Sequence, residues 1–317
     1  MRRHILTPST SQAALEKRGF HRKDAAAKDL LETIGAAFLG GYGDAVETDT
    51  TAALEERLET FPERFRGFAY EGAGMGLAVR DALPVGRSDR VAELLAGPGA
   101  PHVYMIYVGV GWAMARLPRF AWPKPAAYDP LLRWLVHDGY GFHQAYFHTR
   151  RYVDEQYSPA DFGWPAGAAY APRAIDQGIG RALWFVAGTD AARVVELVQR
   201  FGRDRWADLY SGVGLAATYA GGASAAELRL LCDRAGENRR WLAQGSAFAA
   251  EARIRAGLLV PHTTAATEVL CGLPPAAAAQ ITQDVRPDRP VDGAVPAYEA
   301  WRQRIAHELA SLGGVPR

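Results

Sequence analysis

The stretch Tyr107-Val108-Gly109-Val110-Gly111-Trp112-Ala113 places two glycines among apolar residues. Similar small-residue signatures occur at six other places: Ile34-Gly35-Ala36-Ala37, Gly72-Ala73-Gly74-Met75-Gly76, Gly139-Tyr140-Gly141, Gly178-Ile179-Gly180-Arg181-Ala182, Gly212-Val213-Gly214-Leu215-Ala216 and Gly245-Ser246-Ala247. Their central residues follow one another at steps of 39, 37, 30, 39, 34 and 33 residues. A recurring period of this size is typical of stacked two-helix units.

The signatures divide into two similar halves. Gly35, Gly74 and Gly111 precede Gly180, Gly214 and Ala247 by 145, 140 and 136 residues. A duplication explains three offsets that nearly agree, and chance similarity among Ala- and Gly-rich helices is the alternative. We therefore expect a first helical-repeat half over residues 1–160 and a second over 161–317, the latter with a C-terminal helix, within one continuous domain.

Most segments between the signatures show apolar residues at helical spacing. Residues 51–58, 191–199 and 225–234 are the clearest cases, and each follows a capping residue: Asp49 or Thr50, then Asp190, then Ser224 with Glu227 as a capping box. Alternating strand patterns are scarce. The sequence predicts an all-α fold of duplicated helical hairpins that form an α-solenoid or an α/α toroid, two arrangements that the sequence alone does not separate.

Irregular segments are expected between these helices. Proline-rich loops occupy residues 118–130, 161–172 and 284–295, and a last amphipathic helix follows over 298–311. Residues 1 to about 20 read as an extended arm, and 103–108 taken alone resembles a strand. Glycine inside a helix costs about 1 kcal/mol relative to alanine. The signature glycines are therefore expected where helix backbones approach closely.

Composition bounds the class of protein. The 317 residues are 49% hydrophobic and 22% charged, with a net charge of +1, which is ordinary for a packed protein and offers no electrostatic basis for binding nucleic acid. The two cysteines, Cys232 and Cys271, lie in apolar stretches and predict buried thiols in reducing surroundings. The start lacks the apolar region of a secretory signal, and no apolar run of membrane-spanning length occurs, so a cytoplasmic protein is expected.

The period aligns two sets of polar positions. The residue just before each signature is Glu71, Val108, Asp138, Gln177, Ser211 or Gln244, and the residue before that is Tyr70, Tyr107, His137, Asp176, Tyr210 or Ala243. Equivalent positions of stacked hairpins line one surface, so these side chains are expected to share a polar and aromatic cleft. The alternative is that they cap or bridge neighbouring helices, each buried polar atom being satisfied by its neighbour.

The densest polar stretch runs from His137 to Tyr152 and holds three of the eight histidines. His137, His143 and His148 are spaced by six and five residues, which does not place neighbouring pairs on one helical face, so no metal site is expected. A histidine acting as acid or base beside Asp138 is favoured over a metal site. The commoner alternative is that the aromatic and histidine side chains seal a helix contact. The candidate catalytic residues are Asp138, His143 and Glu71. The candidate substrate-binding residues are Tyr70, Tyr107, His137, Tyr140, Asp176, Gln177, Tyr210 and Gln244.

Standard cofactor and nucleophile motifs are missing from the sequence. The Gly-x-Gly stretches lack the strand context of a dinucleotide fingerprint, and no phosphate-loop lysine, Gly-x-Ser-x-Gly elbow, paired-cysteine zinc motif or His-Glu-x-x-His follows. The cofactor is therefore unknown, and the sequence does not name a reaction.

The combination of motifs resembles a known family. It comprises Arg18-Gly19-Phe20, Arg66-Gly67-Phe68-Ala69-Tyr70-Glu71-Gly72, Tyr107–Ala113, Asp138-Gly139-Tyr140-Gly141-Phe142-His143, Asp176-Gln177-Gly178-Ile179-Gly180-Arg181-Ala182-Leu183-Trp184, Leu209-Tyr210-Ser211-Gly212-Val213-Gly214 and Ala243-Gln244-Gly245-Ser246-Ala247. The chain is similar to the enediyne biosynthesis accessory proteins of the UnbL type, formerly a domain of unknown function. The resemblance covers roughly residues 1 to 275.

The resemblance implies a role in building an enediyne antibiotic core from a linear polyene that an iterative polyketide synthase makes. It also implies companion proteins of the same biosynthetic cassette, one propeller-like and one a membrane protein of redox-enzyme type. It supplies no catalytic residues. Two hypotheses follow: an enzyme that binds and modifies the polyene by oxidation, halogenation or cyclisation, or a non-catalytic scaffold or chaperone that docks the companions.

Overall fold

The computed structural model describes residues 13–84, 89–159, 162–164 and 169–312, and the regular secondary structure in these ranges is all helical. The all-α prediction is therefore confirmed. Residues 103–108, which resemble a strand, form the first half of a helix. Among the described residues, no helix is both long enough and apolar enough to cross a membrane.

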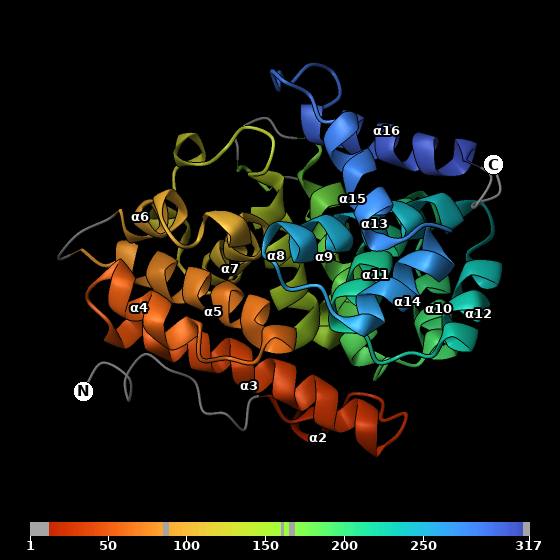
Figure 1. Ribbon diagram of the computed structural model, residues 1–317, viewed down its shortest axis with the longest axis horizontal. Helices are drawn as coiled ribbons and strands as arrows, with labels where there is room; N and C mark the ends of the chain where they lie inside the picture. The colour runs from red at the N-terminus through yellow and green to blue at the C-terminus, as the bar shows by residue number, and fades with distance from the viewer. Residues whose placement is uncertain (1–12, 85–88, 160–161, 165–168, 313–317) are drawn as a thin grey trace.

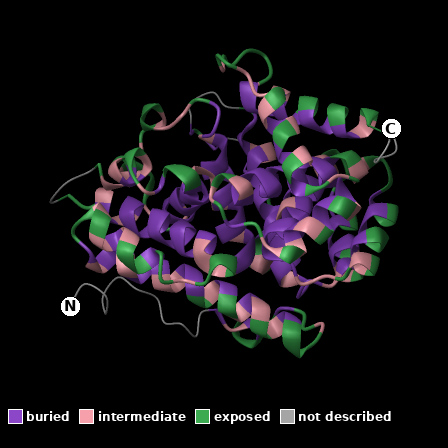
Figure 2. Cartoon of the chain, in the orientation of Figure 1, coloured by how far each residue is buried: buried purple, intermediate pink, exposed green. Residues whose placement is uncertain are grey.

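Seven helices pack against one another in chain order and form the body of the molecule (Figure 1). We call them the central helices: α3 (Ala25–Glu47), α5 (Glu63–Asp81), α7 (Val103–Met114), α8 (Trp134–Phe147), α9 (Ala171–Val186), α11 (Trp206–Ala220) and α13 (Arg239–Arg255). Their residues are mostly buried, as Figure 2 shows. The packing continues from α8 to α9, across the predicted boundary between the two halves.

The Gly-x-Gly signatures explain this order, because each one contacts two neighbouring helices. A Cβ atom at Gly109 would lie 2.0 Å from the carbonyl oxygen of Glu71 in α5, the preceding central helix. One at Gly111 would lie 2.1 Å from the carbonyl oxygen of Val136 in α8, the following one. Glycines at the same two positions of α5, α8, α9 and α11 make the same pair of contacts. The predicted role of these glycines in close backbone packing is confirmed.

The first signature is an exception. Gly35 does not face a central helix: a Cβ there would lie 2.6 Å from the Cβ of Ala13. The residue of α3 that meets α5 is Gly41, where a Cβ would lie 2.0 Å from the carbonyl oxygen of Ala69. Taking Gly41 instead, the interval to Gly180 is 139 residues, beside 140 between Gly74 and Gly214. The offset of 145 residues for the first signature was therefore a register error.

Shorter helices follow five of the central ones: α4 (Thr51–Leu58), α6 (Arg90–Ala96), α10 (Ala191–Gln199), α12 (Ala225–Ala235) and α14 (Pro261–Leu270). The starts of α4, α10 and α12 agree with the predicted caps. The side chains of Thr50 and Asp190 accept hydrogen bonds from backbone N–H groups in the first turns of α4 and α10. Ser224 and Glu227 form the predicted capping box of α12.

The irregular segments agree only in part with prediction. Residues 118–130 contain two short 3₁₀ turns, Arg119–Ala121 and Pro125–Ala127, and residues 285–296 between the last two helices are irregular. Residues 160–161 and 165–168 of the second loop, and residues 1–12 of the arm, lie outside the described part. The rest of the arm is not fully extended, because it includes the short helix α2 (Leu15–Arg18).

Two further helices complete the fold. Helix α15 (Pro275–Asp284) packs on α13, and α16 (Ala297–Ser311) packs on both. Figure 1 shows α16 at the edge of the molecule opposite α2 and α3. The late central helices also return to an early one: an Arg253 amino group in α13 donates to the carbonyl of Arg64 in α5 at 3.1 Å. The rings of Phe68 in α5 and Tyr219 in α11 meet edge to face at 5.2 Å.

Candidate functional site

The structure separates the two sets of polar positions that the sequence aligned. Adjacent residues of a helix point about 100° apart, so the two sets meet different neighbours although both are buried. We call them the inner row and the outer row. The inner row is Glu71, Asp138, Gln177, Ser211 and Gln244, all of which are buried. The outer row is Tyr70, Tyr107, His137, Asp176 and Tyr210. A single cleft lined by both rows is therefore not what the fold builds.

Glu71 and Asp138 of the inner row meet around Arg181, which lies one turn after Gln177 in α9. The Arg181 guanidinium donates to Oδ1 of Asp138 at 2.5 Å and lies 3.9 Å from Oε2 of Glu71. The Gln177 amide donates to the other Asp138 oxygen at 2.9 Å. Two buried carboxyl groups thus share one guanidinium. Because an unbalanced buried charge is costly, one of the two carboxyl groups is expected to hold a proton.

Glu71 is the carboxyl group that keeps the proton. Burial raises the pKa of Glu71 to about 7, and the nearby Arg181 guanidinium offsets only part of this effect. Asp138 differs because both of its oxygens accept hydrogen bonds, from Gln177 and from Arg181. Oε1 of Glu71 completes no hydrogen bond within the described part of the chain. Near neutral pH, Glu71 is therefore poised between a proton donor and a carboxylate.

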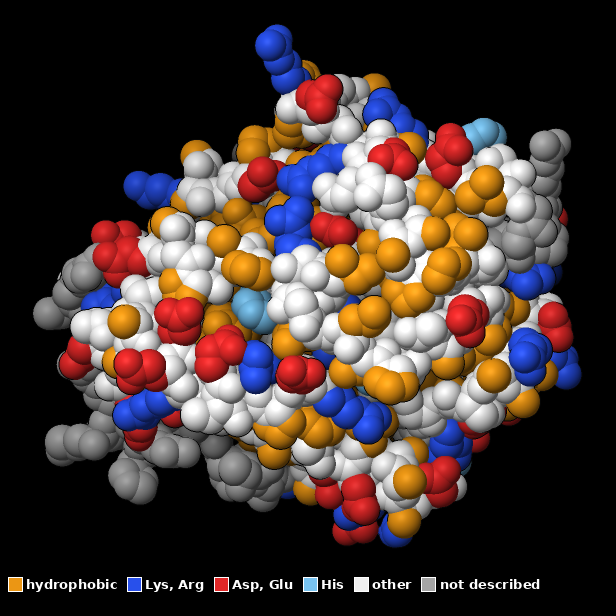
Figure 3. All heavy atoms as spheres, viewed as in Figure 1, with side chains coloured by type: hydrophobic (Ala, Val, Ile, Leu, Met, Phe, Trp, Pro, Cys, Tyr) orange, Lys and Arg blue, Asp and Glu red, His pale blue; other side chains and the backbone are white. Residues whose placement is uncertain are grey.

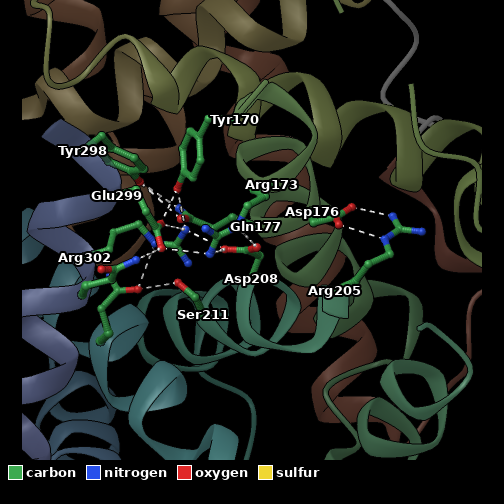
Figure 4. Close-up of polar contacts among 12 residues, drawn as sticks. Tyr170, Arg173, Asp176, Gln177, Arg205, Asp208, Ser211, Tyr298, Glu299 and Arg302 are labelled. Carbon is green, nitrogen blue, oxygen red and sulfur yellow. Dashed lines mark hydrogen bonds and ion pairs between the residues drawn. The ribbon is translucent and has the colours of Figure 1, made fainter. Parts of the chain in front are cut away.

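The rest of the inner row ties α16 to the central helices. Gln177 also donates to the hydroxyl of Tyr298 at 3.1 Å, and the side-chain oxygen of Gln244 accepts from Ser211 and Arg302. Figure 4 shows Arg302 at the centre of a second ionic cluster, with Asp208, Glu299 and Tyr170 around it. Arg302 is fully buried, and Arg173 completes the cluster from its more exposed side. These contacts fix α16 in place.

The outer row contacts the connecting segments instead. Tyr70 stacks on His102 with ring centroids 3.6 Å apart and donates to Glu59 at 3.0 Å. The hydroxyl of Tyr107 accepts from the backbone N–H of Asp129 at 3.0 Å. His137 hydrogen-bonds through Nε2 to the backbone carbonyl of Trp164. These contacts attach the irregular segments to the central helices.

The remaining outer candidates lie apart from Glu71. Asp176 pairs with Arg205 at 2.8 Å, as Figure 4 shows, although burial raises its pKa to about 6. Burial raises the pKa of Tyr210 to about 12, so its phenol stays neutral. Tyr140 accepts a hydrogen bond from Gln144 at 2.9 Å and packs against Phe162.

His143 lies among aromatic rings rather than beside the carboxyl groups. Its ring centroid is 4.7 Å from that of Phe147 and 5.5 Å from that of Trp112. Burial lowers the pKa of His143 to about 3, so its imidazole is neutral at physiological pH. Both carboxylate oxygens of Asp138 are engaged elsewhere. The predicted Asp138–His143 pair therefore has no hydrogen bond between its members in this conformation.

An apolar cavity adjoins Glu71, and no sequence pattern indicated it. We call it the aromatic cavity. It has a volume of about 50 Å³, lies between α3, α5, α7, α8 and α9, and has walls that include Phe38, Phe68, Trp112, Phe142, Phe147 and Phe185. Glu71 is the charged residue in its lining. The indole N–H of Trp112 is also buried and completes no hydrogen bond to a described residue. The Trp112 indole N–H lies close enough to Glu71 to offset part of the rise in its pKa, so these two polar groups are neighbours in apolar surroundings.

Charge on the surface does not point to a site. Figure 3 shows acidic and basic side chains interspersed over the visible face, with apolar side chains between them. The strongest electrostatic features of the described residues are the two buried clusters around Arg181 and Arg302.

Comparison with known proteins identifies a family. A family model described as a protein of unknown function (DUF1702) matches residues 1–309. The chain belongs to this family. No curated protein and no solved structure matches it. The family assignment covers both predicted halves and leaves the activity to be argued from the site.

Proposed function

We propose that the chain is an accessory protein of enediyne antibiotic core biosynthesis that binds a polyketide-derived polyene in the aromatic cavity and modifies it with Glu71. The resemblance of its motifs to enediyne accessory proteins supports the pathway. The observation that supports the site is one buried carboxyl group, with the Trp112 indole beside it, in a cavity otherwise walled by aromatic and aliphatic side chains. Such walls suit a conjugated hydrocarbon chain.

Among oxidation, halogenation and cyclisation, the site favours acid-assisted cyclisation. Protonated Glu71 donates its proton to one carbon of the conjugated chain, and a second double bond attacks the resulting cation to close a carbon–carbon bond. Loss of a proton from the ring carbon back to the Glu71 carboxylate restores the acid. The product is an isomer of the substrate, so the step consumes no oxidant or halide. The pKa of Glu71, raised by burial to about 7, suits this exchange.

The arrangement of the central helices supports the enzyme over an open scaffold. Contacts from Arg253 to Arg64 and from Tyr219 to Phe68 bring the late central helices back to α5. We take this as a helical-repeat array of the α/α toroid kind, in which the polar centre is enclosed. An enclosed polar centre favours chemistry on a small molecule, whereas an open solenoid would favour protein docking.

The alternative, a scaffold for companion proteins, has one observation in its favour. A groove of about 890 Å³ runs along the outer face of α16 beside the start of α13. Trp241 lines it together with Arg240, Arg304 and His307, and Glu308 is the one acidic residue of the described lining. A partner helix with acidic flanks fits a groove of this composition.

Ligand binding tests the proposed site directly. cis-Parinaric acid, a fluorescent conjugated tetraene, is titrated into the purified protein. Leu39→Trp narrows the aromatic cavity and is expected to weaken binding by about tenfold or more. Leu30→Trp is the matched control, since Leu30 lies on the same helix, is also partly buried and does not line the cavity. Equal binding by both variants, or no binding by the wild type, would count against the site.

Complementation distinguishes the enzyme from the scaffold. In a producing strain that lacks the gene, Glu71→Gln is expected to abolish product, whereas Arg304→Glu in the α16 groove is expected to restore it. The reverse pattern would favour docking of companion proteins. Thermal unfolding of both purified variants controls for loss of the fold.

A further inference from the structure

A second apolar cavity lies on the other side of Arg181. It has a volume of about 30 Å³ and is enclosed by α7, α8, α9, α11, α13 and α16. Val108, Leu215, Phe248 and Trp301 contribute to its walls, and Arg181 is the charged residue in its lining. We call it the second cavity. It shares no lining residue with the aromatic cavity.

Arg181 and Glu71 together separate the two cavities. Arg181 lines the second cavity and Glu71 lines the aromatic cavity, and the two side chains face each other at 3.9 Å. The Arg181 guanidinium also lies 4.9 Å from the ring centroid of Phe142, a wall of the aromatic cavity. The contacts between the cavities are thus made by side chains.

Arg181 holds Glu71 less closely than it holds Asp138. The distance of 3.9 Å to Glu71 is too long for a hydrogen bond, whereas Asp138 accepts one from Arg181. Nε of Arg181 is buried and completes no hydrogen bond to a described residue. Arg181 can therefore turn away from Glu71 and keep its bond to Asp138.

The two cavities are too small for a long ligand unless side chains such as Arg181 move. The two cavities hold about 50 and 30 Å³. Each is smaller than the ~150 Å³ cavity that takes up one benzene ring in another protein. The helices cannot spread to make room, because glycines of α7, α8 and α9 bring their backbones into contact with their neighbours. Room must come from side chains.

We propose that the two cavities are halves of one binding site for an elongated apolar chain, which passes between Glu71 and Arg181 when the Arg181 side chain turns aside. This inference rests on the proposed function and extends it, because it assigns the ligand a length that the aromatic cavity alone cannot hold. It also places Glu71 beside the middle of the bound chain rather than at its end.

A chain-length series tests the inference. Octanoic, dodecanoic and octadecanoic acids compete with cis-parinaric acid for the wild type and for Leu215→Trp, which fills the second cavity from a partly buried position. In the wild type, the affinity is expected to increase with chain length, from octanoic acid up to octadecanoic acid. In Leu215→Trp, octanoic acid is expected to bind unchanged, and octadecanoic acid to bind about tenfold more weakly.

Two further variants control for nonspecific effects of the Trp substitution and for unfolding of Leu215→Trp. Leu273→Trp is the matched control, because Leu273 is also partly buried and does not line either cavity. Ala252→Val adds two methyl groups to the second cavity and replaces Leu215→Trp if that variant unfolds. If Leu215→Trp and the wild type show the same dependence of affinity on chain length, the two-cavity site is wrong, whereas binding in the aromatic cavity is unaffected by that result. Failure of every acid and of parinaric acid to bind overturns both.

Discussion

Glu71 links the stability of the protein to pH. Its pKa rises from 4.5 to about 7 on folding, so the folded chain holds an extra proton between these values, and the free energy of unfolding falls as pH rises through them. Between pH 4.5 and pH 8, we expect the wild type to lose about 3 kcal/mol of unfolding free energy relative to Glu71→Gln. Urea denaturation at several pH values measures it.

The comparison with Glu71→Gln removes the contribution of other titrating groups. Asp176 also has a raised pKa, at about 6, and it is present in both proteins. Asp176→Asn serves as a control whose own pH dependence is expected at lower pH. A difference between wild type and Glu71→Gln that stays constant from pH 4.5 to 8 would show that the pKa of Glu71 does not rise on folding.

Arg181 is the residue on which the inner row depends. Arg181→Met leaves Asp138 and Glu71 buried without their shared cation, and is expected to lower the free energy of unfolding by about 3–5 kcal/mol. Adding Asp138→Asn to Arg181→Met is expected to recover part of the loss, because it removes the uncompensated charge. Strictly additive effects in this double-mutant cycle would contradict the ion pair.

The sequence located the polar positions but not their partners. The period correctly placed Glu71, Asp138 and Gln177 at equivalent sites, because a repeat maps sequence position onto helix face. It could not separate the inner from the outer row, since that requires knowing which side of each helix faces the centre. Arg302 comes from a helix outside the repeat, so no local pattern pairs it with Asp208.

At the scale of helices, the close glycine contacts set the stability of the central packing. Gly109→Ala places a Cβ 2.0 Å from a backbone oxygen of α5, so the two helices must separate. We expect a loss of about 3 kcal/mol or more, at the upper end of overpacking effects. Gly40→Ala is the control: its Cβ would meet only the ring of Phe61, at 2.8 Å, and alanine favours the helix.

Thermal or chemical unfolding of the two variants checks this expectation. Gly40→Ala should change stability by less than about 1 kcal/mol, because an aromatic ring can shift where a backbone cannot. Equal effects of the two substitutions would mean that the helix backbones yield easily. The argument for side-chain movement at Arg181 would then lose its basis.

The segment that precedes helix α2 contributes one wall residue to the aromatic cavity. Ala13, just before it, lines the cavity and approaches Gly35 of α3 so closely that an added Cβ would lie 2.6 Å away. Gly35→Ala is therefore expected to push this segment outward and to speed association of cis-parinaric acid, measured by stopped-flow fluorescence. Gly40→Ala, on the same helix and away from Ala13, should leave the rate unchanged. Unaltered association in Gly35→Ala would show that ligands enter elsewhere.

The sequence correctly predicted helix boundaries where a local interaction decides them. Thr50, Asp190 and Ser224 start their helices as expected because a capping side chain acts within its own first turn. The first signature failed for the opposite reason. Gly35 and Gly41 are both small residues in α3, and only the packing partner distinguishes the one that meets α5 from the one that meets Ala13.

At the scale of the molecule, the two predicted halves depend on each other. Asp138 in the first half pairs with Arg181 in the second, and Gly141 and Gly178 join α8 to α9 by backbone contact. Arg253, near the end of the second half, returns to α5 in the first. A half produced alone would expose these buried charges and apolar surfaces to water.

Unfolding should therefore be one cooperative transition, whether or not the two predicted halves arose by duplication. We expect residues 1–160 and 161–317, expressed separately, to be insoluble or to lack a thermal transition, while co-expression restores a complex that unfolds like the whole chain. Calorimetry of the intact protein should give a single peak, because Asp138 and Arg181 cannot be separated without leaving unpaired buried charge in both halves. Two resolved peaks, or one half that folds alone, would mean that the duplication preserved independent units and that the contacts between α8 and α9 contribute little.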